Sequence, residues 1–154
     1  MKLLALGDFL PAVQIVMQFP EVLLPKDITL ETLQALYDRS GLETKIDADG
    51  DLVITRGVSA YVMLSEQANR VLLLTFVGIK EEISRNQKLE FANRVNNEIA
   101  AVRAHVNSRE GVVFDYHVPI EGGVTSEAFL AATDFFLIAI AHAIDRCDQD
   151  DIVR

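Results

Sequence analysis

Cysteine is almost missing from this sequence, which contains one, Cys147. A single cysteine cannot form a disulfide within the chain and cannot supply a cysteine-based zinc finger. The lack of a disulfide framework favours a reduced, cytoplasmic setting. As a nucleophile, Cys147 would need a nearby base or a helix N-terminus to lower its pKa, but it follows a predicted helix and lies beside Asp145 and Asp148. We therefore expect a protonated, unreactive thiol.

Basic residues are also in short supply. The chain has 14 lysines and arginines against 23 aspartates and glutamates, which gives a net charge of −9. Nucleic-acid binding needs clustered basic side chains that neutralise phosphates, and here they are scattered. Anionic membrane surfaces are disfavoured for the same electrostatic reason. We expect neither nucleic acid nor a membrane as a partner.

Long uninterrupted apolar runs are absent too. A membrane-spanning helix needs roughly 18 or more consecutive apolar residues, and the nearest candidate, residues 128–144, contains Asp134 and His142. The first ten residues resemble the start of a secretion signal, with Lys2 followed by apolar residues. Asp8 interrupts that run, and no small-residue cleavage site follows it at the right distance. The sequence predicts neither a membrane span nor a signal peptide.

Apolar residues are nonetheless abundant. Half of the 154 residues are hydrophobic and 24% are charged, which is typical of a packed globular domain of this length. The mean hydropathy is slightly positive, at +0.22. This apolar surplus has to be buried either in a large core or against another chain.

The chain divides into three segments on this pattern: an apolar N-terminal extension (1–28), an α+β domain (29–146) and an acidic C-terminal tail (147–154). In the extension, apolar side chains at helical spacing predict a short helix from Phe9. Pro20 and Pro25 make residues 20–27 unfavourable for regular structure.

Within the domain, the spacing of apolar and turn-forming residues predicts helices that begin near Thr29, Ser84 and Ser126. Hairpins are predicted at 44–55, around the turn 47–50, and at 101–118, around the turn 107–111. Two further strands are predicted, over 60–64 and 70–77. The second is apolar at every position from 71 to 74, which predicts a central strand covered on both faces.

Hairpins dominate this order and no β-helix-β units alternate, so we predict an α+β fold with an antiparallel sheet packed by three helices. Three motifs share their order and spacing with a known family: IDADGDLVI at 46–54, FANRVN at 91–96, and EGGVT at 121–125 followed by Phe129. On these motifs the chain resembles the YbjN family, labelled as sensory transduction regulators of bacteria. The resemblance implies a fold like that of the type III secretion chaperones. It does not extend to the N-terminal extension.

Candidate catalytic and metal-binding residues concentrate in the second hairpin. If Val106 pairs with Val112, Arg103 lies opposite Asp115, and alternation places both on the outer face of the strands. His105 and His117 would then be roughly 13 Å apart along the sheet, too far apart to share one metal ion. The acidic turn 47–51 lacks the ligand spacing of an EF-hand. We predict no catalytic residue, cofactor or metal site.

In the final predicted helix, Glu127, Asp134 and Asp145 fall on one narrow stripe, with Ile138 in its middle and His142 at its edge. The rest of the circumference is apolar, and one sheet can cover only one side of it. The second cover could be the N-terminal extension, a second copy of the chain or another protein. The residues we expect to make such contacts are Phe9, Val13, Met17, Leu130, Phe136, Ile138 and Ile140.

These observations favour a non-catalytic protein–protein interaction module, an adaptor- or chaperone-like regulator that forms a homodimer in the cytoplasm. The alternative is a small-molecule-sensing domain with a pocket between the sheet and the helices. Such a pocket would need convergent polar groups inside the fold.

Overall fold

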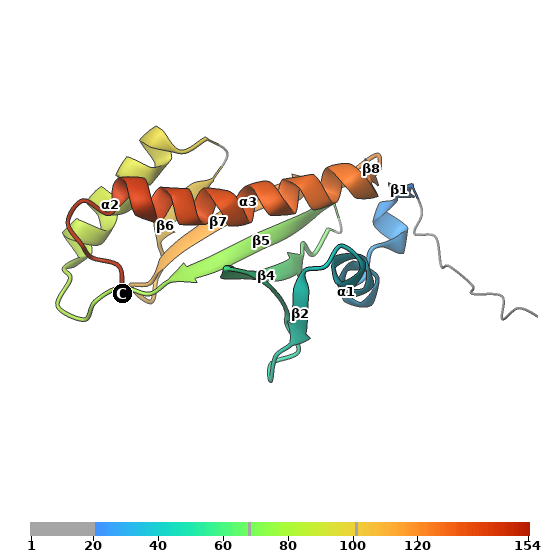
Figure 1. Ribbon diagram of the computed structural model, residues 1–154, viewed down its shortest axis with the longest axis horizontal. Coiled ribbons are helices and arrows are strands. Elements are labelled where there is room, and N and C mark those ends of the chain that lie inside the picture. Colours follow the sequence, from blue (N-terminus) through green and yellow to red (C-terminus); the bar gives the residue numbers. More distant parts are fainter. Residues whose placement is uncertain (1–20, 68, 101) are drawn as a thin grey trace, which may run out of the picture.

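A computed structural model of the chain describes residues 21–67, 69–100 and 102–154 (Figure 1). The predicted helix of the N-terminal extension lies outside the described residues, as do three of the predicted contact residues, Phe9, Val13 and Met17.

An antiparallel sheet of six strands forms the centre of the fold, with the strand order β2-β3-β4-β5-β7-β6. Its strands are β2 (Glu43–Ile46), β3 (Leu52–Arg56), β4 (Val58–Leu64), β5 (Arg70–Val77), β6 (Arg103–Val106) and β7 (Val112–Pro119). Both predicted hairpins are present. Asp47 closes the first turn by accepting hydrogen bonds from the backbone N–H groups of Asp49 and Asp51.

Three helices pack on the sheet: α1 (Leu30–Arg39), α2 (Arg85–Glu98) and α3 (Ser126–Cys147). Thr29 and Ser84 begin the first two with reciprocal capping boxes, and Thr125 caps α3. Such side chains satisfy backbone N–H groups that the first helical turn leaves without partners. Figure 1 shows α3, the longest helix, lying along the strands. The predicted α+β architecture is confirmed.

All three helices lie on the same face of the sheet. Phe91 of α2 stacks on Phe114 of β7, and Phe136 of α3 stacks on Tyr116, two residues further along β7. Tyr37 of α1 contacts α3 through the ring of Phe129. Side chains two residues apart on a strand share one face, so these contacts place the main core between the helices and one side of the sheet.

The opposite face of the sheet carries no helix from the part of the chain that the structure describes. β5 is central, as predicted, because it pairs with β4 on one side and β7 on the other. Its apolar side chains on this second face are not covered, however: Leu72 and Leu74 are half-buried and Phe76 is 57% exposed. The described residues therefore cover β5 on one face, whereas the sequence predicted cover on both.

The glycine pair before α3 makes the predicted sharp turn, with φ angles of 81° at Gly122 and 95° at Gly123. Here a short pair of strands forms that the sequence pattern did not predict, β1 (Val22–Leu23) with β8 (Val124–Thr125). Leu23 is buried in the core. The prolines around β1 allow two paired residues, followed by a single 3-10 turn over Pro25–Asp27.

The acidic C-terminal segment also packs on the domain. Ile152 is buried, and Val153 bridges to Ile79 next to the end of β5. The carboxylate of Asp148 accepts hydrogen bonds from the backbone N–H groups of both Ile152 and Val153. The segment after α3 therefore contributes to the core despite its acidic composition.

Candidate functional site

One side of α3 presents apolar side chains to the surface. Ile138 is 67% exposed, the most among the large exposed hydrophobic side chains of the described residues, and Phe135 is 46% exposed. Ala131 and Ala141 are exposed on the same side, because positions three or four residues apart share one face of a helix. We call these four residues the α3 outer face. It forms an apolar stripe with Ile138 near its middle.

A hollow lies on each side of Ile138. The larger, of about 430 Å³, is lined by Arg56, Gly57, Val58, Leu137, Ile138 and Ala141. The smaller, of about 260 Å³, is lined by Glu98, Ile99, Ala100, Phe135, Ile138, Ala139 and His142. At the margin of the larger hollow, Arg56 pairs with Asp134 at 2.6 Å. The α3 outer face thus combines a protruding apolar side chain with recesses that could accept one.

The structure separates the contact residues that we predicted on α3. Phe136 and Ile140 are fully buried against the sheet, so they belong to the core and not to a contact surface. Leu130 is half-buried, and Ile138 is exposed. Phe136 and Ile140 lie on the side of the helix opposite the stripe of Glu127, Asp134 and Asp145, and this opposite side is the one that meets the sheet. Phe135 was missed, although its spacing of three residues from Ile138 places it on the same side.

α3 is long and apolar enough to cross a membrane, by length and composition alone. In this fold, however, Phe129, Phe136 and Ile140 are buried in the domain core. Asp134 is held in an ion pair with a residue of β3. These contacts are typical of a helix packed on a sheet in a globular domain.

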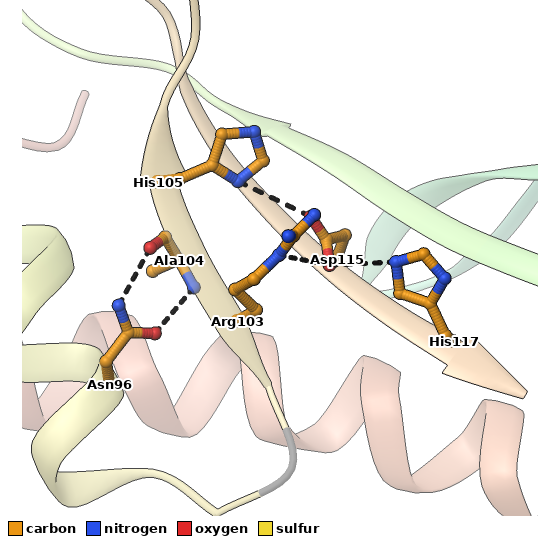
Figure 2. Close-up of polar contacts among 6 residues, drawn as sticks. All are labelled: Asn96, Arg103, Ala104, His105, Asp115 and His117. Carbon is orange, nitrogen blue, oxygen red and sulfur yellow. Dashed lines mark hydrogen bonds and ion pairs between the residues drawn. The ribbon is translucent and has the colours of Figure 1, made fainter.

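The second hairpin carries a polar cluster around Asp115 (Figure 2). The predicted register is confirmed, with Arg103 of β6 directly opposite Asp115 of β7. The Arg103 guanidinium donates to both carboxylate oxygens, through Nε at 3.0 and 3.1 Å and through Nη2 at 2.7 Å. Asp115 itself is only 2% exposed. A buried carboxylate needs such a partner, because removing it from water is otherwise costly.

Two histidines flank the same carboxylate. His105 Nδ1 lies 3.4 Å from Oδ2 of Asp115, and His117 Nε2 lies 3.5 Å from Oδ1. Figure 2 shows the two rings on opposite sides of the carboxylate. Asp115 lies on the outer face of the strands, as predicted, but neighbouring side chains bury it. Among the described residues, no group of three or more His, Cys, Asp or Glu side chains is placed to hold a metal ion.

A hollow of about 340 Å³ adjoins this cluster, lined by Asn96, Val102, Arg103, Asp115, Tyr116 and His117. Its polar groups largely bond within the protein. The Asn96 amide donates to the backbone oxygen of Ala104 at 2.8 Å and accepts from its N–H at 2.7 Å, while Arg103 is engaged by Asp115. These side chains serve the fold, so the hollow does not favour the alternative of a small-molecule sensor.

Cys147 ends α3 and is buried. Burial raises the pKa of its thiol, and the charge of Glu98 adds to that effect. This upward direction of the pKa agrees with the prediction of a protonated thiol. The main cause is burial, and the nearby acidic group is Glu98 of α2, not the aspartates that follow in the sequence.

Residues 29–149 match the family described as "Putative bacterial sensory transduction regulator", YbjN. The chain belongs to the YbjN family. The match begins at the capping residue of α1 and ends two residues after α3. It therefore covers the six-stranded sheet and all three helices, as the three sequence motifs indicated.

A solved structure of a YbjN protein agrees on the fold. YbjN from E. coli is similar with a TM-score of 0.69 and 17% identity, covering 82% of this chain and 96% of its own. The Yersinia pestis type III secretion chaperone SycH, solved with a fragment of YscM2, is similar at a TM-score of 0.46 and 11% identity, covering 73% and 98%. A comparison with curated proteins gives no match.

Proposed function

We propose that this YbjN-family chain is a non-catalytic protein–protein interaction module, an adaptor- or chaperone-like regulator that acts in the cytoplasm. In this proposal the chain forms a homodimer through the α3 outer face. The observation that carries the proposal is the exposure of Ile138 between two hollows on a helix whose other side is buried.

The shape of this face supports a symmetric contact. In a twofold dimer the same patch lies on both subunits, so each protruding residue must meet a recess of the same patch. Ile138 provides the protrusion, and the hollow beside Ala141 provides the recess. Packing one into the other removes apolar surface of both subunits from water, which is the main favourable term in association.

The charge of the chain is consistent with this role. A net charge of −9 keeps a protein with an exposed apolar stripe soluble. Two charged residues of α3 are held in ion pairs, Asp134 with Arg56 and Arg146 with Glu98, at 2.6 Å in both cases. Glu127 and Asp145 are exposed on the same side of the helix as Ile138, but neither lines the two hollows beside Ile138. In the proposed dimer these two carboxylates lie at the ends of the contact, where they stay in water.

Nuclear magnetic resonance spectra recorded during dilution test this proposal. We expect the methyl signals of Ile138 and the ring signals of Phe135 to shift as the protein is diluted from high to low micromolar concentration. Leu89 of α2 is 43% exposed and lies outside the α3 outer face; its signals should not move. Concentration-independent signals from both Ile138 and Phe135 would count against the dimer.

A further inference from the structure

The helix-free side of the sheet is a second uncovered surface, distinct from the α3 outer face. Strand register places its side chains without ambiguity, because Tyr61 of β4 pairs with Leu74 of β5, and Met63 pairs with Leu72. Phe76 lies two residues beyond Leu74 and therefore on the same side. We call these five residues the sheet patch.

The sheet patch is apolar and partly ordered by its own contacts. The rings of Tyr61 and Phe76 meet edge to face, with centroids 5.8 Å apart. Phe76 is nevertheless 57% exposed and Met63 is 41% exposed. A continuous apolar strand at the centre of a sheet is typical of burial on both faces, and here only the helix side is buried. The sequence of β5 therefore indicates a second cover, which residues 21–67, 69–100 and 102–154 do not supply.

Two basic side chains lie at the margins of the sheet patch. Lys45 of β2 and Arg70 of β5 are on the helix-free side by register and are exposed. Arg103 of β6 is on the same side, but its charge is paired with the buried carboxylate of Asp115. Apart from that pair, the strands of this face have two exposed basic residues and one exposed acidic residue, Glu43, on a chain with a net charge of −9. The face therefore has an apolar centre with a basic residue at two of its margins.

We propose that the sheet patch binds an amphipathic helix of another protein, with an apolar face and acidic flanks. A helix with its side chains is about 10 Å wide, and neighbouring strands are about 4.8 Å apart, so one helix spans the two strands of the patch. Its apolar face covers Tyr61, Met63 and Phe76. Its flanking carboxylates then face the basic margins, which complements the charge of this surface.

The charge pattern disfavours two other occupants. A second copy docking through the same face would bring like-charged margins together, which is unfavourable. Residues 1–20 of the chain are apolar but contain one acidic residue, Asp8, and one basic residue, Lys2. That segment lacks the acidic flanks that Lys45 and Arg70 would pair with.

Two designed peptides test the proposal on the full chain. Both have the same leucine and phenylalanine face; one has glutamates on its flanks and the other has lysines. We expect the acidic peptide to bind at least about tenfold more tightly, and added salt to reduce the difference. Fluorescence anisotropy measures both affinities. Equal binding of the two peptides, or no binding of the acidic one, would overturn the proposal.

Variants locate the binding surface. Phe76→Glu and Met63→Glu each place a charge in the sheet patch. Each should weaken the binding of the acidic peptide at least about tenfold. Lys45→Glu with Arg70→Glu should remove its advantage over the basic peptide. Leu89→Glu, at an exposed leucine of α2, is the matched control and should leave binding unchanged. Circular dichroism confirms that each variant is folded. If Ile138→Glu abolished binding and Phe76→Glu did not, the helix would bind the α3 outer face and the proposal would be wrong.

A photocrosslinking residue identifies the occupant directly. Benzoylphenylalanine replaces Phe76 in the full chain, and light links it to whatever lies on the patch. Crosslinks to the acidic peptide support the proposal. Crosslinks to residues 1–20 or to a second copy, undisturbed by excess acidic peptide, overturn it. Because this readout concerns the sheet and not α3, its failure is separate from failure of the proposed dimer.

Discussion

Tyr37 and Thr133 form a buried hydrogen bond of 3.0 Å that links α1 to α3. The Thr133 hydroxyl donates its one hydrogen to the backbone oxygen of Phe129 at 3.1 Å. Tyr37 must therefore be the donor to Thr133, which requires a protonated phenol. Burial raises the pKa of Tyr37 well above its ordinary value, because an ionised phenolate would lose its hydration; the hydrogen bond with Thr133 opposes this shift, and the negative charge of Asp134 adds to it.

This pair predicts a loss of stability in alkaline solution. The folded pKa is raised, so the contribution of Tyr37 is complete below the unfolded pKa of about 10 and falls as the pH rises above it. Tyr37→Phe should cost about 1 kcal/mol at neutral pH through the lost hydrogen bond. Between neutral and strongly alkaline pH, the Tyr37→Phe variant should lose less free energy of unfolding than the native chain, because it has no phenol to ionise at this position. Urea unfolding at a series of pH values measures both; identical pH profiles would contradict the assignment.

Gly123 is constrained by its neighbours as well as by its backbone. Its φ angle is 95°, and a Cβ atom there would lie 2.9 Å from Cγ1 of Val22 and 3.1 Å from Cδ2 of Leu24. Gly57 has a φ angle of 74° with nothing within 4 Å of such an atom. Alanine at Gly57 would therefore meet backbone strain alone, whereas alanine at Gly123 would meet both backbone strain and steric contact.

Alanine at these two glycines should have unequal effects on the free energy of unfolding. Gly57→Ala should cost roughly 1–2 kcal/mol, the penalty of a left-handed backbone for a residue with a Cβ atom. Gly123→Ala should cost about 1–3 kcal/mol more, because the side chains of Val22 and Leu24 must move to make room. Thermal and urea unfolding measure the difference. Equal losses would show that β1 does not pack closely on this turn.

At the scale of elements, Asn96 joins helix α2 to the edge strand β6. Its side-chain amide makes two hydrogen bonds with the backbone of Ala104 (Figure 2), on the edge of β6 that has no neighbouring strand. The amide thus replaces part of the strand partner that an edge lacks. The asparagine pair at 96 and 97 gave no sign of this role, since only the fold brings Asn96 beside β6.

Asn96→Ala should loosen β6 without unfolding the domain. Losing the two hydrogen bonds should cost about 1–2 kcal/mol, and exchange of the Ala104 amide hydrogen should accelerate about tenfold for each 1.4 kcal/mol lost locally. Hydrogen exchange followed by magnetic resonance gives this rate. Asn97→Ala, at the exposed neighbouring position, is the control. Equal exchange rates in the two variants would rule out the role of Asn96.

The elements themselves were largely predictable because their signals are local. Capping residues such as Thr29 and Ser84 and the turn after Ile46 act within a few residues of chain, and they placed the helices and both hairpins. The pairing of Arg103 with Asp115 was predictable because the turn at 107–111 sets Val106 opposite Val112, which fixes the register of the whole hairpin. The burial of Asp115 did not, because it depends on side chains from other parts of the chain.

At the scale of the whole molecule, the apolar surplus of the composition appears on two separate surfaces. One is the α3 outer face, and the other is the sheet patch on the far side of the sheet. A strand or helix with apolar residues on more than one side is expected to be buried on each of those sides. The sequence does not say whether the second contact comes from the same chain or from another protein. Phe136 and Ile140 were assigned to a contact surface although they lie opposite the stripe of Glu127, Asp134 and Asp145 and belong to the core.

The mass of the full chain in solution tests the central claim most directly. Sedimentation equilibrium should give about twice the monomer mass of 17.1 kDa at high micromolar concentration. Ile138→Glu should reduce it to the monomer mass, because a buried charge at the centre of the contact is costly, whereas Phe76→Glu and Leu89→Glu should leave the dimer intact. A monomer mass for the native chain at every concentration, or a dimer that Ile138→Glu does not weaken, would contradict the account.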